Sequence, residues 1–281
     1  MPGTLYVVAT PIGNLEDVTF RALRTLREVS LIAAEDTRRT GRLLQHYSIS
    51  TPTTSLHEHN ERAKSPMLIR RLIEGESIAL VADAGTPGLS DPGAGLVAAA
   101  HDAGIRVEPV PGPSAALAAL SASGFSAAEW LFVGFPPPKA AQRKAWLTRL
   151  AREPRGIILY EAPHRIRATL AEMEEILGNR SIALCKELTK VHEKLVIRPI
   201  VVHRREMSEP RGEYTLVVPP TDTPKTEQSL PGPRELAAEF GEITNSGAVG
   251  RRGAVRMLAQ KYAVSVKEVY QRVQEGLDED D

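Results

Sequence analysis

The first hundred residues alternate between two patterns of hydrophobic and polar positions. Short runs rich in β-branched residues predict strands at 4–9, 29–33, 77–81 and 105–108. Between and after these runs, mixed polar and apolar stretches predict helices near 18–27, 37–46, 60–74 and 93–103. Strands that alternate with helices in this way are typical of a parallel α/β sheet.

From about residue 115 the spacing of the elements changes. Further strands are expected at 130–134, 156–160, 181–187, 194–196 and 213–218. Only two helices are expected among them, near 139–151 and 164–177. The fold class is therefore α/β with two domains, a parallel one over 1–114 and a mixed one over 115–220.

The last sixty residues have a different character. Proline and small polar residues over 221–233 predict a linker, because they cannot support a packed element. Apolar positions then predict short helices at 254–262 and 266–274, separated by a tight break. We expect residues 234–281 to form a small helical domain that resembles a helix-turn-helix.

Composition limits the classes of protein that fit. With 281 residues, 42% of them hydrophobic, the chain can form a sizeable core. Lys plus Arg equals Asp plus Glu at 35 each, so any surface for nucleic acid must be a local patch. The single cysteine, Cys185, and the lack of a secretory signal predict the cytoplasm, and no run of about 18 apolar residues suggests a membrane span.

Three loops rich in glycine and proline follow predicted strands, at 10–14, 83–88 and 111–114. Because parallel strands end at one edge of the sheet, the loops should meet there, where open α/β sheets bind ligands. The first loop lacks the Gly-x-Gly-x-x-Gly fingerprint, and no Gly-x-x-x-x-Gly-Lys-Ser/Thr sequence occurs. Both absences disfavour a nicotinamide cofactor or a nucleoside triphosphate.

A series of short motifs carries a resemblance to a known family. They are Thr10-Pro-Ile-Gly-Asn-Leu-Glu-Asp-Val-Thr19, Ala33-Ala-Glu-Asp-Thr-Arg38, Leu56-His-Glu-His-Asn60, Asp83-Ala-Gly-Thr-Pro87, Asp91-Pro-Gly93, Pro111-Gly-Pro-Ser-Ala115, Tyr160-Glu-Ala-Pro-His-Arg165 and Lys186-Glu-Leu-Thr-Lys190. These motifs, which occur in this order along the chain, make the sequence resemble the bacterial 16S rRNA cytidine 2′-O-methyltransferases. These enzymes form the ribosomal small-subunit methyltransferase I family of the tetrapyrrole-methylase superfamily.

The resemblance implies a fold, a cofactor and partners. The fold is the two-domain tetrapyrrole-methylase fold, the cofactor is S-adenosylmethionine in the interdomain cleft, and a homodimer is usual. The implied substrate is 16S rRNA or the small ribosomal subunit, at a cytidine ribose in the decoding region (P site). The implied cofactor-binding residues are Pro11, Asp83, Ala84, Gly85, Thr86, Pro87, Gly88, Ser114, Ala115, Tyr160, Glu161, Ala162, Leu188, Glu213 and Tyr214.

Methyl transfer from a sulfonium to a hydroxyl is an in-line displacement, which needs alignment and no metal. A ribose hydroxyl is a weak acid, however, so a group that takes or polarises its proton is expected. The catalytic candidates are Glu35, Asp36, Lys186 and Glu187, with Lys186 as a possible proton relay. Asp36 also fits a helix cap, and so does Asp91, which precedes Pro92.

Basic side chains could contact RNA phosphates, although such residues most often coat a solvated helix. The candidates are Arg38, Arg39, Lys139, Arg143, Arg165, Arg251 and Arg252. His57 and His59 have no third ligand at metal spacing, so polar roles near the acceptor are expected and no metal site is predicted.

Two other functions remain open from the sequence. A tetrapyrrole methyltransferase of the precorrin or uroporphyrinogen type would share the fold, which cannot separate it from an RNA enzyme. A non-catalytic RNA-binding protein would use the C-terminal helices alone.

Overall fold

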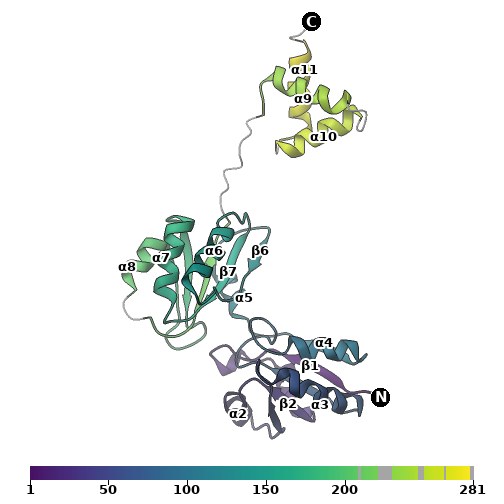
Figure 1. The fold of residues 1–281 in the computed structure, drawn as a ribbon, viewed down its shortest axis with the longest axis vertical. Helices are drawn as coiled ribbons and strands as arrows, with labels where there is room; N and C mark the ends of the chain where they lie inside the picture. The colour runs from purple at the N-terminus through teal and green to yellow at the C-terminus, as the bar shows by residue number, and fades with distance from the viewer. Residues whose placement is uncertain (208–209, 221–229, 246–249, 263, 279–281) are drawn as a thin grey trace. The chain divides into compact units, whose positions relative to one another are not determined.

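A computed structural model describes residues 1–207, 210–220, 230–245, 250–262 and 264–278. The chain forms two compact units, residues 1–221 and 222–281 (Figure 1). The first unit contains two five-stranded sheets that follow one another along the chain.

The first sheet is parallel throughout, as the sequence predicts, with the order β3-β2-β4-β1-β5. Its strands are β1 (Thr4–Val8), β2 (Leu31–Ala34), β3 (Thr53–Ser55), β4 (Ile78–Val81) and β5 (Arg106–Val110). The connecting helices are η1 (Leu15–Asp17), α1 (Phe20–Glu28), α2 (Thr37–His46), α3 (Glu61–Ile73) and α4 (Ala94–Asp102). The short edge strand β3 was not predicted.

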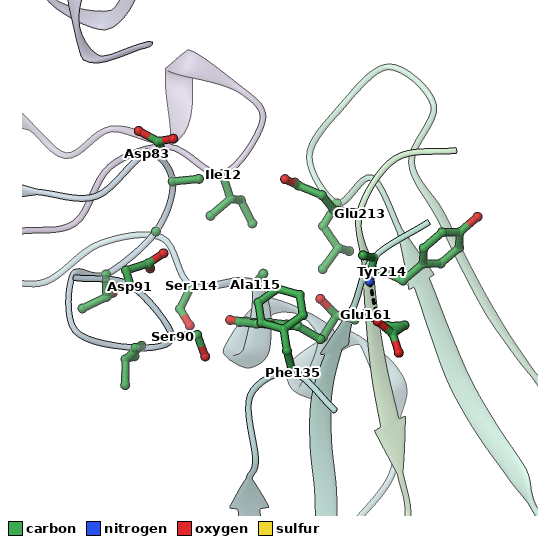
Figure 2. A pocket seen from close by; sticks show the side chains of 18 of the residues that line it. Ile12, Asp83, Ser90, Asp91, Ser114, Ala115, Phe135, Glu161, Glu213 and Tyr214 are labelled. Atoms are coloured by element: carbon green, nitrogen blue, oxygen red, sulfur yellow. Dashed lines mark hydrogen bonds between the residues drawn. The ribbon is translucent and has the colours of Figure 1, made fainter. Parts of the chain in front are cut away.

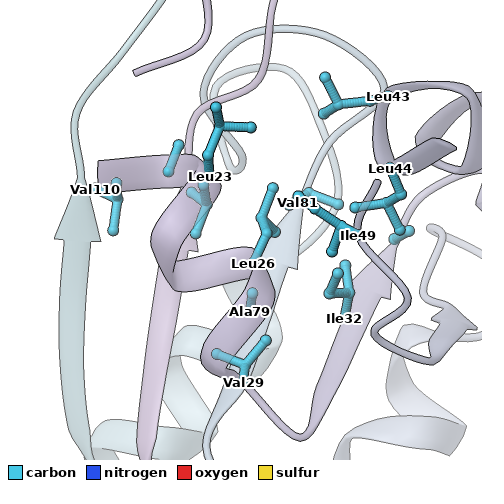
Figure 3. Close-up of a cluster of buried hydrophobic side chains, with 13 residues drawn as sticks. Leu23, Leu26, Val29, Ile32, Leu43, Leu44, Ile49, Ala79, Val81 and Val110 are labelled. Carbon is cyan, nitrogen blue, oxygen red and sulfur yellow. The ribbon is translucent and has the colours of Figure 1, made fainter. Parts of the chain in front are cut away.

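Alternating side chains of the buried strands supply a core on each face of this sheet. On one face, Ala79 and Val81 of β4 pack with Leu23 and Leu26 of α1 and with residues of α2 (Figure 3). On the other face, Leu80 packs with residues of α3 and α4. Helices on both faces leave the strand ends as the open part of the domain.

The second sheet is mixed, with the order β6-β7-β10-β8-β9. Its strands are β6 (Trp130–Phe132), β7 (Gly156–Glu161), β8 (Ser181–Lys186), β9 (Lys194–Pro199) and β10 (Tyr214–Val218), and only β6 and β7 pair in parallel. Its helices are α5 (Ala115–Ser123), α6 (Ala140–Leu150), α7 (Ile166–Leu177) and α8 (Ile200–Glu206). The strands predicted after residue 115 are present, while α5 and α8 were not predicted.

Cys185 lies in the core that α5 forms with this sheet. Burial raises the pKa of its thiol to about 12, so little thiolate is available. We therefore expect Cys185 to resist a thiol reagent such as dithionitrobenzoate in the native protein and to react fully in denaturant. Rapid reaction in the folded protein, followed by absorbance, would contradict this placement.

The C-terminal unit contains α9 (Pro233–Asn245), α10 (Arg251–Lys261) and α11 (Val266–Asp278). The two predicted helices are present, and α9 joins them around a core that includes Leu236, Phe240 and Leu258. Ser265 caps α11, since its hydroxyl accepts the Glu268 N–H at 3.1 Å. In the predicted linker, residues 221–229 lie outside the described residues, and Leu230 packs against the helical core.

No helix among the described residues is long and apolar enough to cross a membrane.

Candidate active site

The loops that follow β1 and β4 are joined at the edge of the first sheet. The Thr10 N–H donates to the Gly85 carbonyl at 2.9 Å, and the Gly85 N–H donates to the Thr10 carbonyl at 3.0 Å. The Thr10 hydroxyl also donates to the Ala82 carbonyl at 3.2 Å. These bonds fix two of the three predicted loops against each other.

A cavity of about 470 Å³ lies beside these loops, within the range of small-molecule sites. Loops of both sheets line it, and Figure 2 shows Asp83, Asp91 and Ser114 of the first part of the chain with Phe135 and Glu213 of the second. Its wall consists of Ile12, Glu35, Arg39, Asp83, Ala84, Gly85, Thr86, Leu89, Ser90, Asp91, Ser114, Ala115, Phe135, Tyr160, Glu161, Ala162, Pro163, His164, Leu188, Glu213, Tyr214 and Thr215.

The structure therefore brings together all the predicted cofactor-binding residues except Pro11, Pro87 and Gly88. Most wall residues follow the end of a strand, and Glu213, Tyr214 and Thr215 lie at the beginning of β10. Their binding role stays a prediction.

Apolar side chains form part of the wall. The centroids of the Tyr160 and Phe135 rings lie 5.4 Å apart, and those of the Tyr160 and Phe132 rings lie 5.0 Å apart. Burial raises the pKa of the Tyr160 hydroxyl, which stays protonated. Ile12 and Leu188 add aliphatic surface to the same cavity.

Carboxylates dominate the polar part of the wall. Glu35 Oε2 accepts the Asp83 N–H at 3.1 Å, and Asp83 Oδ1 accepts the Asp36 N–H at 3.0 Å. Arg39 Nη1 lies 3.1 Å from Asp83 Oδ2. This exchange of bonds ties the end of β2 to the end of β4 and holds Glu35 and Asp83 in fixed positions.

Asp91 is a cavity residue that the sequence analysis assigned to a helix cap. That assignment is wrong, because α4 begins at Ala94 and its N-cap is Gly93, with φ of +118°. The Leu96 N–H is bonded instead by Glu61 Oε1 of α3, at 2.9 Å. Burial, together with the nearby carboxylates of Glu35, Asp83 and Glu213, raises the pKa of Asp91 to about 7.

Of the four catalytic candidates, only Glu35 lines the cavity. Asp36 is the N-cap of α2, where its carboxylate accepts the Arg38 N–H at 2.8 Å. Hydrogen bonds from the Arg38 side chain and backbone hold the pKa of Asp36 far below its ordinary range. Its cap role explains its place in the sequence.

Lys186 ends β8 and Glu187 follows it, but neither contributes to the cavity wall. Glu187 Oε1 accepts from Lys190 Nζ at 2.8 Å and from the Glu213 N–H at 2.9 Å. Burial opposes the ionisation of Glu187, yet these hydrogen bonds outweigh it and its pKa lies below the ordinary value. Glu187 thus holds the loop before β10 in place.

The predicted RNA-binding residues fall into two groups. Arg38 and Arg39 are largely exposed on α2, next to the cavity, and Lys139, Arg251 and Arg252 are exposed elsewhere. Arg143 is buried, which contradicts its predicted contact with phosphate.

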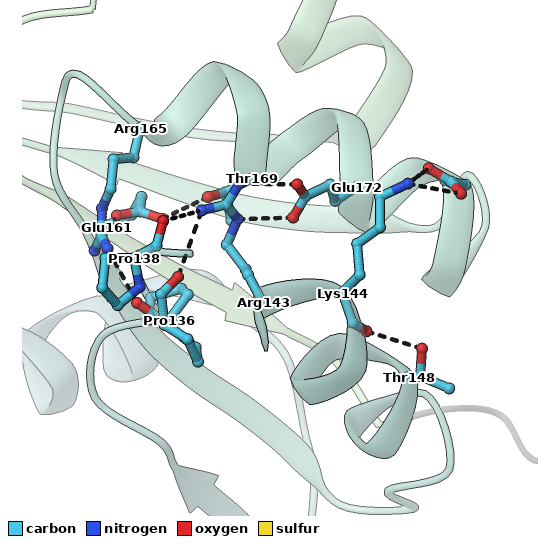
Figure 4. A network of polar contacts seen from close by, with 11 residues as sticks. Pro136, Pro138, Arg143, Lys144, Thr148, Glu161, Arg165, Thr169 and Glu172 are labelled. Carbon is cyan, nitrogen blue, oxygen red and sulfur yellow. Dashed lines mark hydrogen bonds and ion pairs between the residues drawn. The ribbon is translucent and has the colours of Figure 1, made fainter. Parts of the chain in front are cut away.

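Arg143 and Arg165 belong to a network of polar contacts inside the second part of the unit (Figure 4). The Arg143 guanidinium is paired at both ends with the Glu172 carboxylate, at 2.7 and 2.8 Å. Arg165 Nη2 lies 2.7 Å from Oε1 of the buried Glu161, and its Nη1 donates to the Pro136 carbonyl at 3.1 Å. The guanidinium groups of both arginines are therefore engaged in hydrogen bonds and ion pairs within the protein.

Within the described ranges, no group of three or more His, Cys, Asp or Glu side chains is arranged to hold a metal ion.

Comparison with known proteins identifies the class. Residues 4–201 match the family of tetrapyrrole (corrin/porphyrin) methylases. Among solved structures, the methyltransferase CobJ matches with a TM-score of 0.60 and 19% identity, over 78% of this chain and 95% of that one. A uroporphyrin-III-C-methyltransferase from Thermus thermophilus matches with a TM-score of 0.55 and 22% identity, over 77% and 94%. These likenesses confirm the predicted fold.

Curated relatives narrow the class further. A protein of Synechocystis named ribosomal RNA small subunit methyltransferase I is 45% identical over 96% of each chain. A protein of that name from Pseudomonas aeruginosa is 48% identical over 81% of this chain and 83% of its own. The chain therefore belongs to the tetrapyrrole methylases and, among them, to the family of ribosomal RNA small subunit methyltransferase I. It is a methyltransferase that uses S-adenosylmethionine.

The cavity fits this cofactor. Among the described residues, its wall carries the carboxylates of Glu35, Asp83, Asp91, Glu161 and Glu213, whereas Arg39 is its sole Lys or Arg. Such a wall favours a cationic sulfonium over a polyphosphate. The aliphatic and aromatic part of the wall can pack against the adenine ring and the methylene groups of the cofactor.

Proposed function

We propose that the protein methylates the ribose 2′-hydroxyl of a cytidine in the decoding region (P site) of 16S rRNA. The name of relatives that align over most of the chain supports small-subunit rRNA as the substrate, and the resemblance of the sequence motifs to cytidine 2′-O-methyltransferases supports the ribose target. The acidic cavity and the exposed arginines beside it support the proposal. The carboxylates of the cavity suit a cationic sulfonium, and the arginines suit RNA phosphates.

When bound, S-adenosylmethionine supplies an electrophilic methyl carbon, to which the ribose oxygen bonds as the carbon–sulfur bond breaks. The protein positions the two reactants and excludes water. Ile12, Leu188 and Phe135 provide the apolar walls, and the fixed carboxylates of Glu35 and Asp83 supply negative charge. Arg38 and Arg39 would hold the phosphates of the nucleotides that flank the target.

A homodimer is also proposed, as is usual for this fold. Sedimentation velocity at micromolar concentration would test it, and a single species at the 30.6 kDa of one chain would oppose it.

The substrate proposal is tested by offering labelled S-adenosylmethionine with three separate acceptors. They are naked 16S rRNA, small subunits from a methylation-deficient strain, and a uroporphyrinogen-type tetrapyrrole. We expect label in RNA, recovered after nuclease digestion as 2′-O-methylcytidine by mass spectrometry. Label in the tetrapyrrole alone, or on a base of the RNA, would overturn the proposal.

A further inference from the structure

We propose that Asp91 is the catalytic base, the group that takes the proton from the ribose 2′-hydroxyl. This inference rests on the proposed function, because it concerns the hydroxyl acceptor. It differs from the four candidates predicted from the sequence, which were Glu35, Asp36, Lys186 and Glu187.

The backbone around Asp91 is held in an unusual conformation at the cavity. Ser90 has a φ of +71°, in the left-handed region that a serine rarely adopts. A Cβ placed on Gly134, which follows β6, would lie 2.9 Å from the Ser90 hydroxyl oxygen. The loop before α4 thus packs closely against the loop after β6, and Asp91 lies where the two halves of the cavity meet. Strain of this kind is found at functional sites.

Asp91 is also the cavity carboxylate that is free to accept a proton. Glu35 and Asp83 are engaged by backbone N–H groups, and Asp83 also by Arg39. Glu161 is bound by Arg165 and by the Thr169 hydroxyl, and Glu213 carries a side chain that is 72% exposed. Within the part of the chain that the structure describes, no hydrogen-bond donor reaches the Asp91 carboxylate. Its oxygens therefore lack a competing partner.

The groups around Asp91 favour its protonated form. The carboxylates of Glu35, Asp83 and Glu213 face it, the Tyr160 hydroxyl is neutral, and Arg39 is drawn to Asp83. The other titratable groups among the described wall residues are His164, Tyr214 and Glu161, and Glu161 is paired with Arg165. A carboxylate that is partly buried among other carboxylates becomes a stronger base, and its pKa of about 7 matches an operating pH near neutrality.

In the proposed step, the proton moves from the ribose 2′-hydroxyl to the Asp91 carboxylate. The bond between hydrogen and the ribose O2′ breaks, the proton passes to a carboxylate oxygen of Asp91, and the electron pair stays on O2′. That pair forms the new bond to the methyl carbon. Asp91 then releases the proton to solvent after the product leaves.

The test compares Asp91→Asn with wild type in single-turnover methylation of small subunits or 16S rRNA across pH 5–9. A positioned base contributes about 10²–10⁴-fold, so a loss of at least about 100-fold is expected. The wild-type rate should rise about tenfold per pH unit below about 7 and then level, whereas the rate of the variant should lose this rise. The matched control is Asp102→Asn, which removes an exposed carboxylate at the end of α4 and should keep the wild-type profile.

Two further measurements do not depend on turnover. Carbon-13 spectra of aspartate-labelled protein should contain one carboxyl that titrates near pH 7 and is absent from Asp91→Asn. Calorimetric binding of S-adenosylhomocysteine should change less than about threefold between the two proteins, which shows that the cavity is intact.

The outcomes separate this proposal from the proposed function. If the wild type methylates ribose and Asp91→Asn does so at the same rate, Asp91 is not the base. The same conclusion follows if the variant loses cofactor binding in proportion to its rate. If the wild type fails to methylate any ribose, the proposed function itself is wrong.

Discussion

Replacement of Arg143 by methionine should lower the free energy of unfolding by about 3–5 kcal/mol. Both ends of the Arg143–Glu172 pair are almost inaccessible, with side chains 5% and 11% exposed. Removing the guanidinium would leave the Glu172 carboxylate buried without a counter-charge, and would also orphan the Pro138 carbonyl that accepts from Arg143 Nη1 at 3.2 Å. Urea denaturation followed by circular dichroism measures the change.

The neighbouring residue provides the matched control. Lys144 pairs with Glu175 at 2.7 Å, but these side chains are 47% and 61% exposed. Lys144→Met should therefore cost less than about 1 kcal/mol. Equal losses for the two variants would show that the burial of Arg143 does not matter. If the Arg143→Met protein is folded but has a lower affinity for RNA, the phosphate contact predicted for Arg143 from the sequence would be supported.

A larger side chain at Ala115 should weaken cofactor binding. Ala115 is the first residue of α5, and it lines the cavity between the two sheets. An added ring at this position enters space that the ligand needs, at a cost of about 1–3 kcal/mol for overpacking. We expect Ala115→Phe to reduce the affinity for S-adenosylhomocysteine roughly 5- to 150-fold in calorimetry.

Leu117→Phe adds a ring to the same helix outside the cavity, where Leu117 is 65% exposed. Its affinity for S-adenosylhomocysteine should stay at the wild-type value. Unchanged binding by Ala115→Phe, with a wild-type melting temperature, would place the cofactor elsewhere.

Periodicity predicted the long elements of this fold and failed at the short or atypical ones. Strand β3 has only three residues, two of them threonine, too few to show an alternation. Helix α5 is mainly alanine and serine, so it has no clear apolar stripe although it covers one face of the second sheet. Neighbouring elements, and not local pattern, define both.

The site could be located from the sequence but its chemistry could not. Gly- and Pro-rich loops after strands indicated the cavity, because the edge of a parallel sheet follows from topology alone. The environment of a carboxylate depends on residues far away in the chain, as with Asp91 beside Glu35 and Glu213. The same is true of Arg143, whose partner lies 29 positions later on another helix.

The paired bonds between Thr10 and Gly85 give the cavity a property that loops seldom have. Two turns joined by a β-bridge lose their conformational entropy when the chain folds. Ligand binding therefore does not have to order them, and this entropy cost does not reduce the binding free energy. One wall of the cleft is therefore preorganised. The amide hydrogens of Thr10 and Gly85 should exchange slowly with solvent in the absence of cofactor, at a rate closer to those of β1 and β4 than to those of exposed turns.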